Sequence, residues 1–313
     1  MFLSILESIS PVFVLLALGY GLRLLSFAGE DFWKYLDRFC YQLLFPTLLF
    51  SKISTVEISS NLLETVTISI YGGFFAGFLT AYILAKAFST TPALSTSVIQ
   101  GACRHNTFMA LALSELLLGA EGLAIATLVS AVLIPITNVT LVMSMAIIVR
   151  RKAQQNLVVT IIYDLVRNPL IIGMGLGFIV NLSDAYPLPV VSMTADILGQ
   201  AALPLILMSV GAHISVKNFH GHLFPAFLSM VGKLLVFPTA VYSAIVFMNA
   251  DPLTAMVLMI FGVVPTAPSG FSLAKAMGGD AEAMASIITV HTLCAFVMLP
   301  VMMFFFYQHF GLP

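Results

Sequence analysis

Residues 42–51 read QLLFPTLLFS, and residues 200–209 read QAALPLILMS. Gln, Pro, Leu and Ser stand at matching places in the two stretches, inside long apolar runs. About sixty residues after each Pro, an apolar segment is interrupted near its middle, first at residues 104–106 and then at residues 265–268. A chain that repeats itself over half its length, with one interrupted membrane helix in each half, has the sequence layout of a secondary transporter.

The composition is that of a membrane protein. Hydrophobic residues make up 60% of the 313 residues, charged residues make up 9%, and the mean hydropathy is +1.04. Soluble domains carry roughly 25% charged residues. The apolar runs are continuous rather than alternating, which excludes a β-barrel. The net charge of −1 argues against nucleic-acid binding, and the three scattered cysteines predict no metal site and no cofactor. We therefore expect an all-α integral membrane protein.

The hydropathy pattern predicts ten transmembrane helices with short connections. Their ranges are 4–26, 32–54, 62–88, 93–118, 121–149, 157–181, 188–213, 223–248, 252–277 and 282–308. The longest polar stretch, residues 150–156, lies midway and predicts two halves, 1–152 and 153–313. Because each half has an odd number of helices, the second half runs upside down relative to the first. We therefore expect two inverted five-helix repeats.

Basic residues predict the orientation of the chain. With both termini outside, only Lys52 lies on the outer side. The inner loops and helix ends then hold Arg23, Lys34, Arg38, Lys86, Arg150, Arg151, Lys152, Arg167, Lys217 and Lys275. This bias predicts extracytoplasmic termini.

The first interruption carries two ionisable groups and an amide at the middle of the fourth span. An unwound segment here exposes carbonyl groups on one half-helix and N–H groups on the other. Arg104 either compensates the dipoles of the broken helix ends or contacts an anionic substrate, and the first interpretation is preferred. For Asn106 we prefer substrate contact over a structural cap. Thr107 follows in the same segment and joins the predicted substrate-binding set.

The second interruption lies in the ninth span. Pro265 and Pro268 remove two backbone donors and predict an unwound segment, although prolines also occur in ordinary kinked membrane helices. The neighbouring Thr266 and Ser269 complete the predicted substrate-binding residues. Two half-helix N-termini that converge near the bilayer midplane would offer N–H groups to an anion.

Three further polar residues are candidates for ion or proton coupling. His105 has a suitable reference pKa, but a hydrogen-bonded core histidine is the preferred interpretation. Asp196 lies in the seventh span, either as part of a relay or as an outward-facing carboxylate. Lys233 either balances the broken end of the ninth span or snorkels to the inner surface.

Several of these segments resemble the auxin efflux carrier family, over nearly the whole chain. The similar segments are 44–50 (LFPTLLF), 104–106 (RHN), 168–171 (NPLI), 202–205 (ALPL), 233–238 (KLLVFP) and 265–268 (PTAP). The resemblance implies crossed broken helices 4 and 9, as in the sodium/proton antiporter and bile-acid symporter folds. It also implies a dimerising scaffold of helices 1, 2, 6 and 7, and a moving transport domain of helices 3–5 and 8–10. Carried over by motif, Asn106 is the candidate substrate ligand, and Pro265 and Pro268 shape the crossing.

The resemblance and the residues together predict a secondary carrier in a bacterial plasma (inner) membrane. Its expected substrate is a small organic anion, a carboxylate such as malate or malonate, moved by elevator-type alternating access. The alternative is a sodium- or proton-coupled carrier or exporter of an auxin-like aromatic acid or an amino acid. An enzyme is not expected, because the sequence has no cluster of nucleophile, base and metal ligands.

Overall fold

A computed structural model describes residues 2–149, 157–183, 189–214 and 219–310. Within these ranges all regular structure is helical, which confirms the predicted all-α class. Six stretches are long and apolar enough to cross a membrane: Phe2–Leu24, Ser60–Phe88, Pro92–Val149, Pro189–Ala212, Leu223–Met248 and Ala281–Phe310. The predicted boundary between the halves at residues 152 and 153 lies outside the described residues, as do Arg150, Arg151, Lys152 and Lys217.

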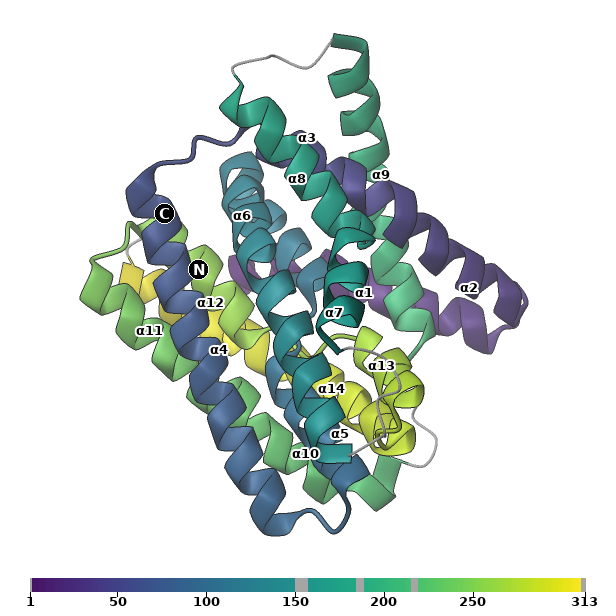
Figure 1. Ribbon diagram of the computed structural model, residues 1–313. Coiled ribbons are helices and arrows are strands. Elements are labelled where there is room, and N and C mark those ends of the chain that lie inside the picture. The colour runs from purple at the N-terminus through teal and green to yellow at the C-terminus, as the bar shows by residue number, and fades with distance from the viewer. Residues whose placement is uncertain (1, 150–156, 184–188, 215–218, 311–313) are drawn as a thin grey trace.

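The helices follow in chain order (Figure 1). The first part of the chain forms α1 (Phe2–Leu24), α2 (Glu30–Phe39), η1 (Cys40–Leu44), α3 (Phe45–Thr55), α4 (Ser60–Phe88), α5 (Pro92–Cys103) and α6 (Thr107–Val149). The second part forms α7 (Leu157–Val166), α8 (Pro169–Leu182), α9 (Pro189–Ala212), η2 (Phe219–His222), α10 (Leu223–Met230), η3 (Val231–Val236), α11 (Phe237–Met248), α12 (Pro252–Val263), α13 (Ser269–Met277) and α14 (Ala281–Phe310).

Three helices begin where a polar residue precedes a proline. The side chain of Thr91 accepts a hydrogen bond from the N–H of Leu94 at 3.1 Å, and Pro92 opens α5. Asn168 caps α8, and Asp251 caps α12, in the same way. The cap oxygen satisfies a free N–H of the first turn, and the following proline has no N–H to satisfy. Local sequence therefore sets these helix starts.

Besides the fourth and ninth spans, which are interrupted, three predicted spans differ from single straight helices. The span predicted at 157–181 is divided between α7 and α8 by a turn at Arg167 and Asn168, because the proline that follows disfavours helical backbone before it. The π-helical turns η1 and η3 interrupt the second and eighth spans. Each is followed by a helix with a proline near its start, Pro46 or Pro238, which removes a backbone donor. Within α6, Gly119 interrupts the helical backbone, with φ 69° and ψ −158°, between the predicted spans 93–118 and 121–149.

The helices pack in two groups. In one, α1 packs against α9, and α3 packs against both α8 and α9; Figure 1 shows α3 and α8 side by side. In the other, α4 packs against α5 and α11, and α12 packs against α6 and α14. Glycine permits the close contact of α1 with α9, because a Cβ on Gly19 would lie 2.6 Å from the carbonyl carbon of Met208. A Cβ on Gly211 would lie 2.7 Å from the carbonyl carbon of Leu16.

Two reciprocal serine–aspartate hydrogen bonds join α9 to α3 and to α2. Ser51 on α3 donates to Asp196 on α9, and Ser209 on α9 donates to Asp37 on α2. Lys52 Nζ lies 4.0 Å from the Asp196 carboxylate. His213 Nε2 lies 3.3 Å from the Asp37 carboxylate. The structure thus places the coupling candidate Asp196 between α3 and α9, in contact with a serine and a lysine.

Candidate functional site

The two interrupted segments meet inside the protein. The first lies between the end of α5 at Cys103 and the start of α6 at Thr107, and the second lies between the end of α12 at Val263 and the start of α13 at Ser269. The N–H of Asn106 donates to the carbonyl oxygen of Pro265 at 2.9 Å. Both breaks occur where the sequence predicts them, and this hydrogen bond brings them into direct contact.

Asn106 starts a new helix after the first break. Its side-chain Oδ1 accepts from the N–H of Met109 at 3.1 Å, and its carbonyl accepts from the N–H of Ala110 at 3.0 Å. These are the two bonds of an N-cap residue. The amide oxygen therefore has a structural partner, whereas the amide Nδ2 is buried without a hydrogen-bond partner.

A cavity of about 700 Å³ lies beside the two breaks. Its walls come from η1, both breaks, α6, the end of α7, the turn that follows it, the start of α8, and α13. The polar side chains that line it belong to Tyr41, Gln42, Arg104, His105, Thr107, Thr137, Asn138, Arg167, Asn168, Ser269 and Ser272. Among the lining residues that the structure describes, none is an aspartate or a glutamate. The cavity therefore carries positive charge without an acidic group to balance it.

Arg104 is the buried cation of this cavity, with 8% of its surface exposed. Its Nη1 donates to Ser269 Oγ at 3.0 Å, and its Nε lies 3.4 Å from Gln100 Oε1. Gly270 leaves room for the side chain, because a Cβ there would lie 3.3 Å from Arg104 Cδ. Both hydrogen-bond partners are neutral, and within the described ranges no carboxylate forms an ion pair with Arg104. An anion in the cavity would supply the missing charge.

Other buried polar atoms at the breaks have no hydrogen-bond partner. They include Gln100 Nε2, Asn106 Nδ2 and Thr266 Oγ1. Buried polar groups are satisfied in the great majority of cases, so clustered exceptions mark a place for water or a ligand. Because all three belong to the interruptions or to the turn of α5 before them, these segments are the candidate site.

Lys233 lies behind the site. It is fully buried, its Nζ donates to the carbonyl oxygen of Phe261 at 3.2 Å, and the ammonium lies 4.7 Å from the ring centroid of Phe237. Phe261 belongs to the last turn of α12, where carbonyl groups lack helical partners. Lys233 thus contacts the broken end of the ninth span and does not snorkel. The ring of His105 packs on Phe237 at 4.4 Å, between the cavity and Lys233.

The predicted residues therefore separate into three sets. Arg104, His105, Thr107 and Ser269 line the cavity together. Asn106, Pro265, Thr266 and Pro268 belong to the interruptions but are not among the lining residues. Asp196 and Lys233 lie elsewhere, as described above. The lining residues that were not predicted from the sequence include Tyr41, Asn138 and Arg167. The one available signal was that Arg167 immediately precedes the Asn-Pro pair that starts α8.

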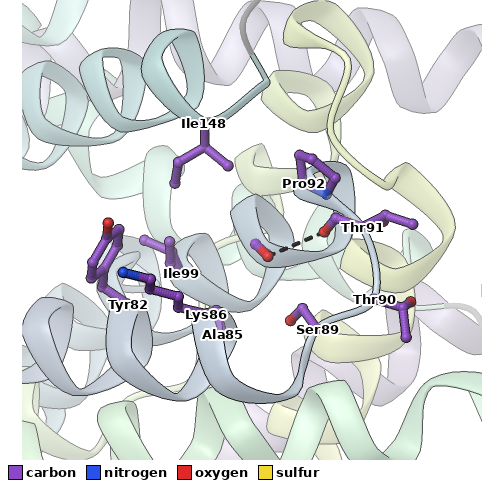
Figure 2. A pocket seen from close by; sticks show the side chains of 10 residues that line it. Tyr82, Ala85, Lys86, Ser89, Thr90, Thr91, Pro92, Ile99 and Ile148 are labelled. Carbon is purple, nitrogen blue, oxygen red and sulfur yellow. Dashed lines mark hydrogen bonds between the residues drawn. The ribbon is translucent and has the colours of Figure 1, made fainter.

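A second cavity, of about 310 Å³, lies at the turn between α4 and α5 (Figure 2). Lys86 contributes its basic group, and Ser89, Thr90 and Thr91 contribute hydroxyl groups. None of the residues predicted to bind substrate lines this cavity. We therefore place the candidate site at the larger cavity beside the breaks.

Comparison with known proteins agrees with a transport role. The family described as "Membrane transport protein" matches residues 4–303. An uncharacterized transporter from Methanothermobacter thermautotrophicus is 24% identical over 302 residues, which are 96% of this chain and 97% of that protein. Ileal sodium/bile acid cotransporters from Oryctolagus cuniculus and Homo sapiens are 27% identical over 105 residues and 32% identical over 101 residues. These matches cover 33% and 31% of this chain, but only 30% and 29% of the cotransporters.

Proposed function

Because the chain belongs to the membrane transport protein family, which includes the auxin efflux carriers, we propose that it is a secondary transporter for a small organic anion. The favoured substrates are carboxylates of the malate or malonate type. The family is one of membrane transporters and not of enzymes. In this proposal the substrate binds in the cavity beside the helix breaks. The cavity volume of about 700 Å³ is in the range of small-molecule binding sites.

The observation that carries this proposal is the guanidinium of Arg104. It faces a cavity without aspartate or glutamate among its described lining residues, and its hydrogen-bond partners are uncharged. Burial of an unpaired charge is costly, and a carboxylate that binds Arg104 removes that cost with a charge-assisted hydrogen bond. A neutral or cationic substrate would leave the cost in place.

The proposed mechanism is elevator-type alternating access. Of the ten predicted transmembrane spans, the first, second, sixth and seventh would form the scaffold. The third to fifth and the eighth to tenth would form the transport domain that carries the substrate. The reciprocal pairs Ser51–Asp196 and Ser209–Asp37 support two inverted repeats, 1–152 and 153–313, because each repeat supplies one serine and one aspartate. The cavity is lined by residues of both helix groups, as a site between scaffold and carrier requires. A homodimer in a bacterial plasma membrane, with both termini extracytoplasmic, completes the proposal.

Uptake by purified protein in liposomes tests the function. Proteoliposomes should accumulate radiolabelled malate or malonate above the level of protein-free liposomes, and unlabelled carboxylates should compete. Amines of similar size should not compete, because the cavity is cationic. Equal accumulation with and without protein, for a panel of carboxylates that includes aromatic acids, would overturn the proposal.

The alternative is a sodium- or proton-coupled carrier or exporter of an auxin-like aromatic acid or an amino acid. The partial match to two sodium/bile acid cotransporters favours sodium coupling, and His105 on the cavity wall favours proton coupling. Uptake driven by an imposed sodium gradient, compared with an equal potassium gradient, separates this alternative from an uncoupled carrier. A pH gradient imposed at constant sodium tests the proton.

Asn106→Ser separates the two roles of Asn106. The variant keeps a side-chain oxygen that can cap Met109, loses the Nδ2 donor and adds no charge. If Nδ2 donates to the substrate, we expect at least about tenfold weaker carboxylate binding, since a hydrogen bond to a charged group contributes about 1.5–3 kcal/mol. Thermal unfolding without ligand should change little. Asn106→Ala is the matched control, because it loses the cap as well and should lower stability by about 1 kcal/mol.

A further inference from the structure

The cavity beside the helix breaks holds a second guanidinium. Arg167 lines it together with Arg104, but the two arise from different places in the fold. Arg104 belongs to the break between α5 and α6, whereas Arg167 lies in the turn between α7 and α8. The lining that the structure describes thus combines two arginines with no acidic residue.

Local structure fixes the position of Arg167. Its N–H donates to the carbonyl oxygen of Tyr163 at 3.1 Å, which closes the last turn of α7. Its guanidinium carbon lies 4.0 Å from the centroid of the Tyr163 ring. Stacking on an aromatic ring holds the guanidinium plane without neutralising its charge. Over the described part of the chain, the ion pairs involve other residues, so the hydrogen-bond donors of Arg167 remain available to an anion.

The neighbouring Asn168 adds to this donor character. Its Oδ1 already accepts from the N–H of Leu170 at 3.0 Å and from the hydroxyl of Tyr41 at 3.3 Å. The polar atom left to face the cavity is therefore the amide Nδ2, which is a donor. Arg104 lies on one wall of the cavity, and Arg167 and the amide of Asn168 lie together on another. This arrangement matches two separated negative groups.

We infer that Arg167 is a specificity-determining residue that contacts the second negative group of a dianionic substrate while Arg104 contacts the first. This inference rests on the proposed function. It narrows the small organic anions of that proposal to dianions, the class to which malate and malonate belong, and assigns Arg167 to the second carboxylate. A monocarboxylate can neutralise one of the two guanidinium groups and leaves the other unpaired. A dicarboxylate neutralises both guanidinium groups. Its second negative charge therefore makes the protein prefer a dicarboxylate over a monocarboxylate.

Pairs of ligands that differ in one charge test the inference. Malonate, succinate and glutarate are each compared with their monoamide, which has nearly the same size but a single negative charge. Dissociation constants come from thermal-shift titrations of the purified full-length protein. For the dicarboxylate that binds best, the wild-type protein should prefer the dianion over its monoamide by at least about tenfold.

Arg167→Gln should reduce this preference to within about twofold, with binding of the monoamide unchanged. Lys86→Gln is the matched control: it removes the same charge at the smaller cavity between α4 and α5 and should keep the wild-type preference. Arg167→Lys should retain part of the preference. Arg167 lies in an exposed turn, and unfolding without ligand serves as the check on folding.

The outcomes separate the inference from the proposed function. If the wild-type protein prefers dicarboxylates and Arg167→Gln keeps the full preference, the role of Arg167 is wrong and the carrier function stands. If the wild-type protein binds a dicarboxylate and its monoamide equally, the dianion class is wrong. If no carboxylate of either kind binds or is taken up, the proposed function itself fails.

Discussion

Arg104→Gln is expected to abolish measurable uptake of labelled dicarboxylate into proteoliposomes. Glutamine keeps a polar group of comparable reach but removes the charge that the anion needs. A hydrogen bond to a charged group contributes about 1.5–3 kcal/mol, which corresponds to roughly 10- to 150-fold in affinity. The loss should affect dicarboxylates and their monoamides alike, unlike the selective loss expected for Arg167→Gln.

Arg104 also follows the carbonyl end of α5, so a structural role has to be separated from a binding role. Arg104→Lys keeps a positive charge near these carbonyl groups but loses the planar fork that binds a carboxylate with two donors. We expect Arg104→Lys to unfold at nearly the wild-type temperature and to bind the anion more weakly. Uptake at the wild-type rate by Arg104→Gln would contradict the assignment of Arg104 to the site.

The helix breaks could be predicted because their causes are local. Pro265 and Pro268 remove backbone donors from the ninth span, whatever surrounds them. In the fourth span, adjacent polar groups in an apolar run cannot face lipid and mark an unusual segment. Polar residues before Pro92 and Pro252 likewise identify helix starts, and the structure has both starts at those prolines. These signals depend on a few neighbouring residues, which a single sequence contains.

The composition of the site could not be predicted in the same way, because it depends on contacts between distant segments. Tyr41 and Asn168 form a hydrogen bond in the lining of the cavity, and nothing near either residue in the sequence indicates the other. Lys233 lies in a π-helical turn, which changes the direction of its side chain relative to a regular helix. The regular helical periodicity of the sequence therefore does not decide whether the Lys233 side chain reaches the inner membrane surface or the end of α12. The partner of Asp196, Ser51, lies in the other half of the chain.

Gly19→Ala should cause the largest loss of stability among single methyl additions to α1. The new Cβ would lie 2.6 Å from the carbonyl carbon of Met208 and 2.8 Å from its Cα, which are backbone atoms of α9 that cannot rotate away. Overpacking costs about 1–3 kcal/mol of stability and occasionally more. We expect a loss at the upper end of this range because the added Cβ overlaps backbone atoms, which cannot move aside as a side chain can. Gly21→Ala is the matched control on the same helix, because its Cβ would meet nothing within 4 Å. Helix propensity should make that variant more stable by roughly 0.5–1 kcal/mol.

Gly211→Ala on α9 should reproduce the loss, because its Cβ would meet the carbonyl group of Leu16 on α1. Both substitutions push the same two helices apart, so the double variant should lose less stability than the sum of the single variants. The measurement is the free energy of unfolding in detergent micelles, by denaturant titration of all four variants and the wild-type protein. Additive losses would mean that the two glycines act at independent contacts, and an unchanged stability in Gly19→Ala would mean that α1 and α9 are not in close contact at this position.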